Sequence, residues 1–145
     1  VSTPISFKDS SSFKDIKLVV GKYLPETFYA AIKGDEHLGE FSSRCTKCMN
    51  LRLENTAIYA KESGYDLFST TLSISPYKNS NIINDLGYQL ADKYQIEYLY
   101  SNFKKEEGYK NSIKISKELN LYRQDYCGCI YSKKEHEAKI DGSKN

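Results

Sequence analysis

The sequence predicts an α/β fold in which helices flank a parallel sheet. Predicted strands and helices alternate along the chain, and the segments between strands are long enough for the helical crossovers that join parallel strands. A length of 145 residues also suits one domain that buries its own core. We therefore expect a flexible, serine-rich lead-in over residues 1–14 and a single α/β metal-binding domain over residues 15–145.

The first half of the chain predicts one strand and two helices. Apolar residues recur at every second position in residues 15–20, which is the period of a strand with a buried face. A helix is expected after Pro25, ending near Gly34, and a second one over residues 49–60, ending at Gly64. Glycine is typical at such ends because it adopts the left-handed backbone conformation without strain.

The second half continues the alternation. Residues 66–72 (DLFSTTL) predict a strand, residues 75–80 a turn, and residues 82–90 a helix that tolerates one internal glycine. A further strand is expected over residues 96–100. The last expected helix covers residues 108–119, with apolar side chains on one face and lysines on the other.

Parallel sheets bind their ligands where the strands end. The hydroxyl-rich residues 70–78 leave a predicted strand at its carboxyl end, so we expect them at the site. The chain contains neither GxGxxG nor GxxxxGK[ST], so no motif predicts a dinucleotide or a P-loop nucleotide.

The overall charge and hydropathy exclude other classes. Lys and Arg total 21 against 19 Asp and Glu, and a net charge of +2 is too small to predict a nucleic-acid partner by itself. No apolar run approaches the roughly 20 residues of a membrane helix, and the first residues lack the apolar centre of a secretory signal. We expect a cytoplasmic protein with no membrane partner.

All four cysteines fall in two tight pairs. Cys45 and Cys48 lie in RCTKC, and Cys127 and Cys129 flank Gly128 in YCGC. Both spacings let two sulfurs converge on one metal centre, and the glycine lets the second pair bend tightly. The alternatives are two disulfides or four buried thiols, but a cytoplasmic chain of this size does not need disulfides to fold. Metal binding is the favoured interpretation.

The spacing does not decide which metal is bound. Four thiolates suit a structural zinc as well as an iron-sulfur cluster. A zinc ribbon usually repeats the two-residue spacing in both pairs, whereas the second pair here has one intervening residue, which favours a cluster or a redox site. A thioredoxin-type dithiol is a third possibility, although no strand is predicted directly before Cys45.

Four segments together resemble the QueH family of epoxyqueuosine reductases: RCTKCMNLRL, GYDLFSTTLSISPYKN, FKKEEGYKNS and LYRQDYCGCIYS. The resemblance covers residues 17–132. It implies a Rossmann-like α/β fold and a cobalamin-independent enzyme that converts epoxyqueuosine in tRNA to queuosine. It also implies a [4Fe-4S] cluster with an additional iron, and an electron donor that the sequence does not identify. The thiol positions of the family correspond here to Cys45, Cys48, Cys127 and Cys129.

The chain departs from the family pattern at its amino terminus. Family members usually open with a strand and a Cys-Cys-Ala-Pro segment that adds metal ligands, and no counterpart precedes Lys17. Two interpretations follow. The chain is a fragment truncated at the amino terminus, or it is a degenerate relative that binds a simpler metal or none.

Removing an epoxide oxygen requires a proton donor, and two tyrosines are candidates by position. Tyr126 precedes Cys127, and Tyr65 precedes the strand predicted over residues 66–72. The alternative for both is a tyrosine of the core or its rim, which is common in a chain with 13 tyrosines. Arg123 and Gln124 are candidates for holding the modified base or a phosphate.

A basic stripe is the expected tRNA-binding surface. Its cations lie on the last predicted helix and on both sides of it, where they form one positive edge. The alternative is a solvated face, because glutamates interrupt the stripe. The candidate RNA-binding residues are Lys104, Lys105, Lys110, Lys114, Lys117 and Arg123.

Three functions therefore compete. The first is an iron-sulfur reductase that modifies tRNA, and the second is an RNA-binding module that four thiolates and a zinc stabilise without catalysis. The third is an inactive fragment of the reductase with vacant thiols. The metal content of the purified protein distinguishes them.

Overall fold

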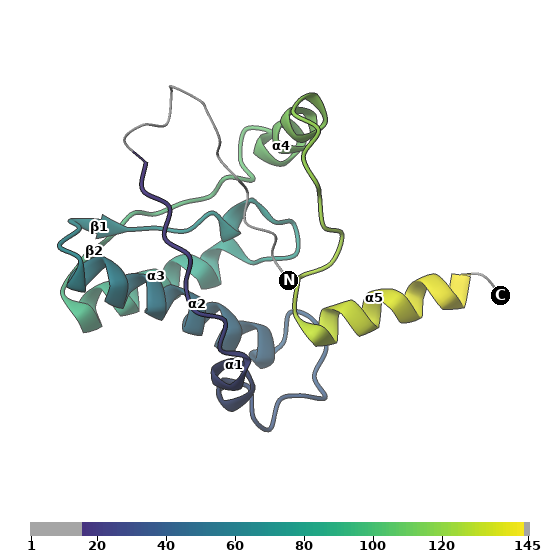
Figure 1. Cartoon of the computed structure of the whole chain (residues 1–145), viewed down its shortest axis with the longest axis horizontal. Helices are drawn as coiled ribbons and strands as arrows, with labels where there is room; N and C mark the ends of the chain where they lie inside the picture. Colours follow the sequence, from purple (N-terminus) through teal and green to yellow (C-terminus); the bar gives the residue numbers. More distant parts are fainter. Residues whose placement is uncertain (1–15, 144–145) are drawn as a thin grey trace.

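The computed structural model describes residues 16–143, so the lead-in expected over residues 1–14 lies outside the described residues. The described part contains five α-helices, one short 3-10 helix and two strands (Figure 1). In chain order they are α1 (Pro25–Ala31), α2 (Ser43–Glu62), β1 (Leu67–Phe68), η2 (Leu72–Ile74), α3 (Ser80–Tyr94), β2 (Glu97–Tyr98), α4 (Gly108–Glu118) and α5 (Ile130–Ser143).

The two strands form a parallel pair joined by α3. Leu67 pairs with Glu97, and Phe68 pairs with Tyr98. This β1–α3–β2 unit confirms the parallel crossover, but the rest of a Rossmann-like sheet is not seen in residues 16–143. Both strands are shorter than expected. β1 ends early because the chain bends into η2, where the hydroxyl of Thr70 accepts a hydrogen bond from the backbone N–H of Leu72 at 3.1 Å.

The strand predicted over residues 15–20 is wrong for the described residues 16–20, which have no regular structure. Ile16, Leu18 and Val20 are 67%, 60% and 75% exposed. An alternating apolar pattern becomes a strand only where a neighbouring strand takes up its backbone hydrogen bonds. Within residues 16–143, β1 and β2 pair only with each other, so this segment has no strand beside it.

The core lies between α2, α3 and one face of the strands. Along α2 the buried apolar residues recur every three or four positions, which is the predicted helical period. They pack against buried residues of α3 and against Phe68 and Tyr98 of the strands. The core residues are Met49, Leu53, Ala57, Ala60, Phe68, Ile83, Leu90, Ile96 and Tyr98.

Helix α2 begins earlier than the apolar period predicts. It starts at Ser43, so Cys45 and Cys48 lie inside its first two turns and not in a loop before it. Its expected end is confirmed, because Gly64 follows with a φ of +75°. The early start matters for the site, since it fixes the directions of both thiols on a rigid element.

The glycine inside α3 is required by packing. A Cβ atom at Gly87 would overlap the ring of Tyr98, which lies on β2 directly beside the helix. The ring of Tyr98 is buried between Phe68, at a centroid distance of 5.1 Å, and Tyr88, at 5.3 Å. Gly87 therefore lets the crossover helix approach its own sheet closely.

The helices near the carboxyl end differ in how well the sequence predicts them. α4 covers Gly108–Glu118, as expected. α5 was not predicted, because it has no apolar stripe and its buried residue is Ser132. Figure 1 shows α5, in yellow, projecting away from the body that α2, α3 and the strands form.

Within residues 16–143 no helix is both long and apolar enough to cross a membrane.

We expect Gly87→Ala to lower the free energy of unfolding by about 1–3 kcal/mol, because the new methyl group overpacks the Tyr98 ring. Helix propensity alone would favour alanine by about 1 kcal/mol. Chemical denaturation measures the difference. The matched control is Gly142→Ala in α5, where a Cβ meets nothing within 4 Å, and which should not destabilise the protein. Equal stabilisation by both substitutions would contradict the packing argument.

Candidate functional site

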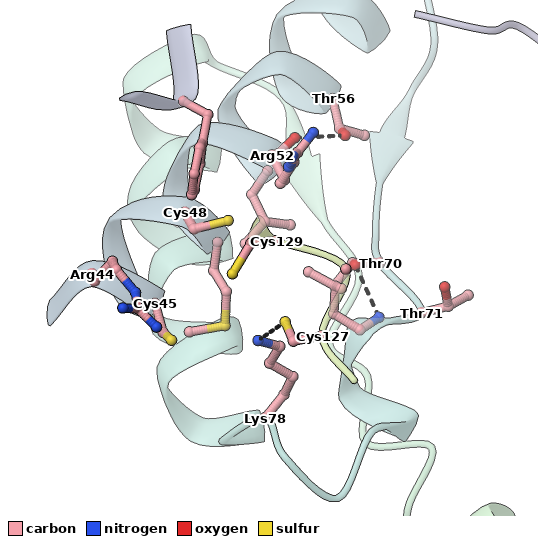
Figure 2. Close-up of a pocket in the computed structure, with 15 residues that line it drawn as sticks. Arg44, Cys45, Cys48, Arg52, Thr56, Thr70, Thr71, Lys78, Cys127 and Cys129 are labelled. Atoms are coloured by element: carbon pink, nitrogen blue, oxygen red, sulfur yellow. Dashed lines mark hydrogen bonds between the residues drawn. The ribbon is translucent and has the colours of Figure 1, made fainter. Parts of the chain in front are cut away.

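All four cysteines line one cavity of about 420 Å³ (Figure 2). The amino-terminal half of α2 forms one wall, the segment after β1 forms a second, and the turn before α5 forms the third. The expectation that the two remote cysteine pairs meet is therefore confirmed. Thr70, Thr71 and Lys78 also line the cavity, which confirms that residues 70–78 lie at the site.

Helix α2 presents the first pair to the cavity together with two polar side chains. Cys45, Cys48, Arg52 and Thr56 are spaced by three, four and four residues, so they lie on one face of the helix. Figure 2 shows this row along the helix, with the two thiols at its amino-terminal end. Both thiols are half-buried and unoxidised.

The second pair lies on a tight turn. Gly128 has a φ of +71°, which glycine adopts readily, and this confirms the bend predicted between the two cysteines. The backbone N–H of Cys127 donates to the hydroxyl of Ser132 at 2.9 Å, and the N–H of Ser132 donates to the sulfur of Cys129 at 3.3 Å. The first turn of α5 therefore fixes both cysteines.

Ser132 also connects this turn to the loop before α2. Its side chain is 2% exposed, and its hydroxyl donates to the carboxylate of Glu40 at 2.9 Å. A buried hydroxyl that accepts one hydrogen bond and donates another is held in a single orientation. The turn with Cys127 and Cys129 is held at the amino-terminal end of α2 by this contact.

Arg44 makes the second connection. Its guanidinium is buried and donates to the backbone oxygens of Glu36, at 3.3 Å, and Leu38. It also contacts the carboxylate of Glu135 at 3.3 Å and lies over the ring of Tyr131 at 4.7 Å. One cation thus joins the loop before α2 to α5.

Lys78 places a positive charge among the sulfurs. Its ammonium donates a hydrogen bond to the sulfur of Cys127 at 2.8 Å, drawn in Figure 2. Burial acts to lower the pKa of Lys78, but the hydrogen bond to Cys127 and the charges of the nearby thiolates outweigh it. The pKa of Lys78 therefore lies above its ordinary value, and the side chain stays a charged donor at neutral pH.

The thiol of Cys48 is largely desolvated. Burial raises the pKa of this thiol above its usual value, while Arg52 and Lys78 act in the opposite direction. A metal that binds Cys48 must therefore displace a proton at neutral pH. Arg52 and Lys78 together offset the negative charge that several thiolates would gather in one cavity.

The donor set fits a thiolate-bound metal centre, since four sulfurs and two compensating cations share one cavity. Among residues 16–143, no three histidine, cysteine or carboxylate side chains form a group that could hold one metal ion. The four cysteines line the walls of the cavity.

Neither predicted proton donor lines the cavity. The ring of Tyr126 stacks on His136 at a centroid distance of 5.9 Å, and Nε2 of that histidine lies 3.2 Å from the carboxylate of Asp125. Tyr65 lies beyond the other end of α2, in a different hollow with Asp92 and Glu97. Because a helix rises about 1.5 Å per residue, the stretch of α2 from Cys48 to its end at Glu62 places Tyr65 roughly 20 Å along the helix from the nearer α2 thiol.

The six predicted RNA-binding cations do not form one set. Lys105, Lys110, Lys114 and Lys117 are exposed on and before α4. Arg123 lies beside the same helix, donates to the hydroxyls of two of its serines at 2.9 and 3.3 Å, and stacks near the Tyr109 ring. Lys104 differs from the others, because it is half-buried and its ammonium donates to two backbone oxygens.

Comparison with known proteins supports the resemblance stated above. The family described as Epoxyqueuosine reductase QueH matches residues 5–135. The chain belongs to the QueH family. The protein named Epoxyqueuosine reductase QueH from Thermotoga maritima is 41% identical over 122 residues, covering 82% of this chain and 64% of that protein. The protein of the same name from Streptococcus pyogenes is 40% identical over 119 residues, covering 82% of this chain and 47% of that protein.

The chain thus spans between about half and two thirds of the length of these two QueH relatives. The match includes both cysteine pairs, the segment with residues 70–78 and helix α4. It therefore covers every wall of the thiol cavity.

Two cavity residues of this QueH chain were not singled out from the sequence, although a signal for each exists. Arg52 lies four and seven residues after Cys48 and Cys45, the helical spacing that puts it on their face. Lys78 lies inside residues 70–78, the stretch that was predicted to lie at the site because it is rich in hydroxyl side chains. Arg44 has no such signal, because its partners are backbone oxygens of the loop before α2 and a side chain of α5, a helix that was not predicted.

We expect Ser132→Ala to lower the free energy of unfolding by about 1–3 kcal/mol, since it removes the buried hydroxyl that accepts from the part-buried N–H of Cys127 and donates to Glu40. The control is Ser143→Ala at the exposed end of α5, whose hydroxyl bonds only within its own helix. Urea denaturation followed by circular dichroism checks both. If the two variants were equally stable, Ser132 would not hold the turn.

Proposed function

We propose that this chain is the thiol-bearing and RNA-contacting part of an epoxyqueuosine reductase, which converts epoxyqueuosine in tRNA to queuosine. The observation that carries the proposal is the single cavity lined by all four cysteines, in a chain of the QueH family. We take the reaction from the names of the relatives, and we propose that it occurs in the thiol cavity.

The proposed cofactor is a [4Fe-4S] cluster with an additional iron, to which Cys45, Cys48, Cys127 and Cys129 contribute thiolate ligands. A single zinc needs its four sulfurs at about 2.3 Å from one point. A cluster attaches its thiolates to different irons, so it suits cysteines that line a cavity from different walls. When bound, such a centre supplies electrons one at a time and a Lewis-acidic site for oxygen.

Removal of the epoxide oxygen breaks two carbon–oxygen bonds, consumes two electrons and two protons, and leaves an alkene and water. The electrons come from a separate donor. In this chain, Arg52 and Lys78 place positive charge where negative charge develops on the departing oxygen. The apolar side chains of Phe28, Met49 and Leu53 line the same cavity and exclude water from it.

Of the two predicted proton donors, Tyr126 is the one we keep in the proposal. It directly precedes Cys127, but its ring stacks on His136, so donation into the cavity requires this stack to open. Tyr65 lines a different hollow beyond the carboxyl end of α2, so we leave it out of the proposed reaction.

The proposed tRNA surface is the lysine face of α4. Lys110, Lys114 and Lys117 follow one another at helical spacing, and Lys105 and Arg123 extend the positive edge at either side. Lys110 lies 3.1 Å from Glu107, and Lys114 lies 3.9 Å from Glu118. These pairs are exposed and weak, so phosphate groups can replace the glutamates as partners.

We expect anaerobically purified protein to be brown and to contain iron and sulfide. Cys48→Ser should abolish retention of the cluster while leaving the helical content nearly unchanged, because Cys48 lies on a helix that the core already holds. Iron and sulfide analysis together with circular dichroism measures both. The control is Thr46→Ser on the same helix, whose residue lines a different hollow.

Other outcomes of this experiment point to other functions. Colourless protein with one zinc, and loss of folding in Cys48→Ser, would support a zinc-stabilised RNA-binding module. Folded protein without metal would support an inactive fragment.

We expect Lys110→Ala combined with Lys114→Ala to weaken tRNA binding and to reduce the slope of log K against log salt by about two, one for each lost phosphate contact. Binding measured at several salt concentrations tests this. The matched control is Lys133→Ala with Lys139→Ala on α5, which removes two exposed lysines from another helix. An unchanged slope in the α4 variant would remove these lysines from the interface.

A further inference from the structure

Lys104 points inward, although it belongs to the basic stripe in sequence. Its ammonium donates hydrogen bonds to the backbone oxygens of Ser75, at 3.0 Å, and Lys78, at 2.5 Å. Burial lowers the pKa of Lys104 from its usual value. Two of the three N–H donors of this ammonium are used by carbonyl groups, so it is less available to phosphate than a fully exposed lysine.

The two carbonyl groups belong to the turn over residues 75–78. Within this turn the N–H of Lys78 donates to the carbonyl of Ser75 at 3.2 Å, and the N–H of Tyr77 donates to the hydroxyl of Ser75 at 3.2 Å. The Lys104 ammonium bonds both ends of the turn. It therefore fixes the backbone from which the Lys78 side chain extends.

The backbone of Lys104 is itself anchored to the same part of the chain. The hydroxyl of Ser101 donates to the carbonyl of Thr70 at 3.0 Å and lies 3.1 Å from the hydroxyl of Ser73. The N–H of Phe103 donates to the Ser73 hydroxyl at 3.3 Å. The segment that carries Lys104 is thus tied to the segment that leads to Lys78.

We propose that Lys104 is a positioning residue of the thiol cavity, which fixes the turn over residues 75–78 and so holds the Lys78 ammonium against the sulfur of Cys127. Lys78 makes the contact with the sulfur, at 2.8 Å, and Lys104 acts through it. This role replaces phosphate binding for Lys104. It follows from the hydrogen bonds alone, and only the redox and tRNA-binding readouts below rest on the proposed function.

A double-mutant cycle in the metal-free chain tests the order of the two lysines. Lys78→Met removes the donor to Cys127, and we expect hydrogen exchange in peptides over residues 124–133 to become at least threefold faster. Lys104→Met should accelerate exchange in those peptides and also over residues 75–78. Because Lys104 acts through Lys78, the double variant should exchange over residues 124–133 no faster than Lys78→Met alone.

Matched variants separate positioning from general destabilisation. Lys105→Met removes the neighbouring exposed lysine and should leave exchange unchanged. Lys104→Arg keeps a charged donor and should restore most of the protection. Should Lys104→Met fail to fold by circular dichroism, Lys104→Gln, which retains an N–H donor for the carbonyls, takes its place in the cycle. Additive acceleration in the double variant, or none in the Lys104 variant, would overturn the proposal.

Two further measurements add independent outcomes. Hydrogen bonds to ligand sulfurs raise the reduction potential of a cluster, so Lys78→Met and Lys104→Met should both shift the potential of the iron-loaded chain to more negative values. A chain that takes up no iron contradicts the proposed function, and the exchange cycle still decides the role of Lys104. Lys104→Met should also leave the salt slope of tRNA binding unchanged. A fall of about one in that slope would return Lys104 to the RNA surface and overturn the proposal.

Discussion

The buried guanidinium of Arg44 joins parts of the chain that otherwise have little to hold them together. It bonds the loop before α2 through two carbonyl oxygens and reaches α5 through Glu135 and the ring of Tyr131. α5 lacks an apolar stripe, so burial of hydrophobic area does not dock it. The two cysteine pairs therefore meet because polar groups are satisfied there, with Ser132 and Glu40 as the second connection.

A similar polar network is built around Asn84 on the crossover helix α3. The amide of Asn84, which is 3% exposed, donates to the carbonyls of Ser80 and Ser101 and accepts from the hydroxyl of Tyr98 and the N–H of Ser101. These four bonds use the full capacity of one side-chain amide. They hold α3 against the end of β2, so strands of two residues each are enough to position the site.

The sequence predicted the helices with a regular apolar period and the turns with glycine. Met49, Leu53 and Ala57 marked α2, and Gly64 marked its end, because both signals are local. The meeting of the cysteine pairs was predicted from their chemistry. The strand predicted at residues 16–20 was wrong, and α5 was missed, for the same reason. The structure of both segments depends on partners distant in the chain, and a local hydrophobic period carries no information about such partners. The inward direction of Lys104 likewise depends on carbonyls about 26 residues away in sequence.

The attachment of α5 has a mechanical consequence. Contacts with the rest of the protein come from Tyr131, Ser132, Glu135 and His136, whereas residues 137–143 are exposed. A helix of 14 residues is roughly 21 Å long, and its first turns carry these contacts. Any rotation about the contacts would therefore displace the far tip more than it displaces Cys129. A spin label or fluorophore on this tip would report on the geometry of the sulfurs without touching them.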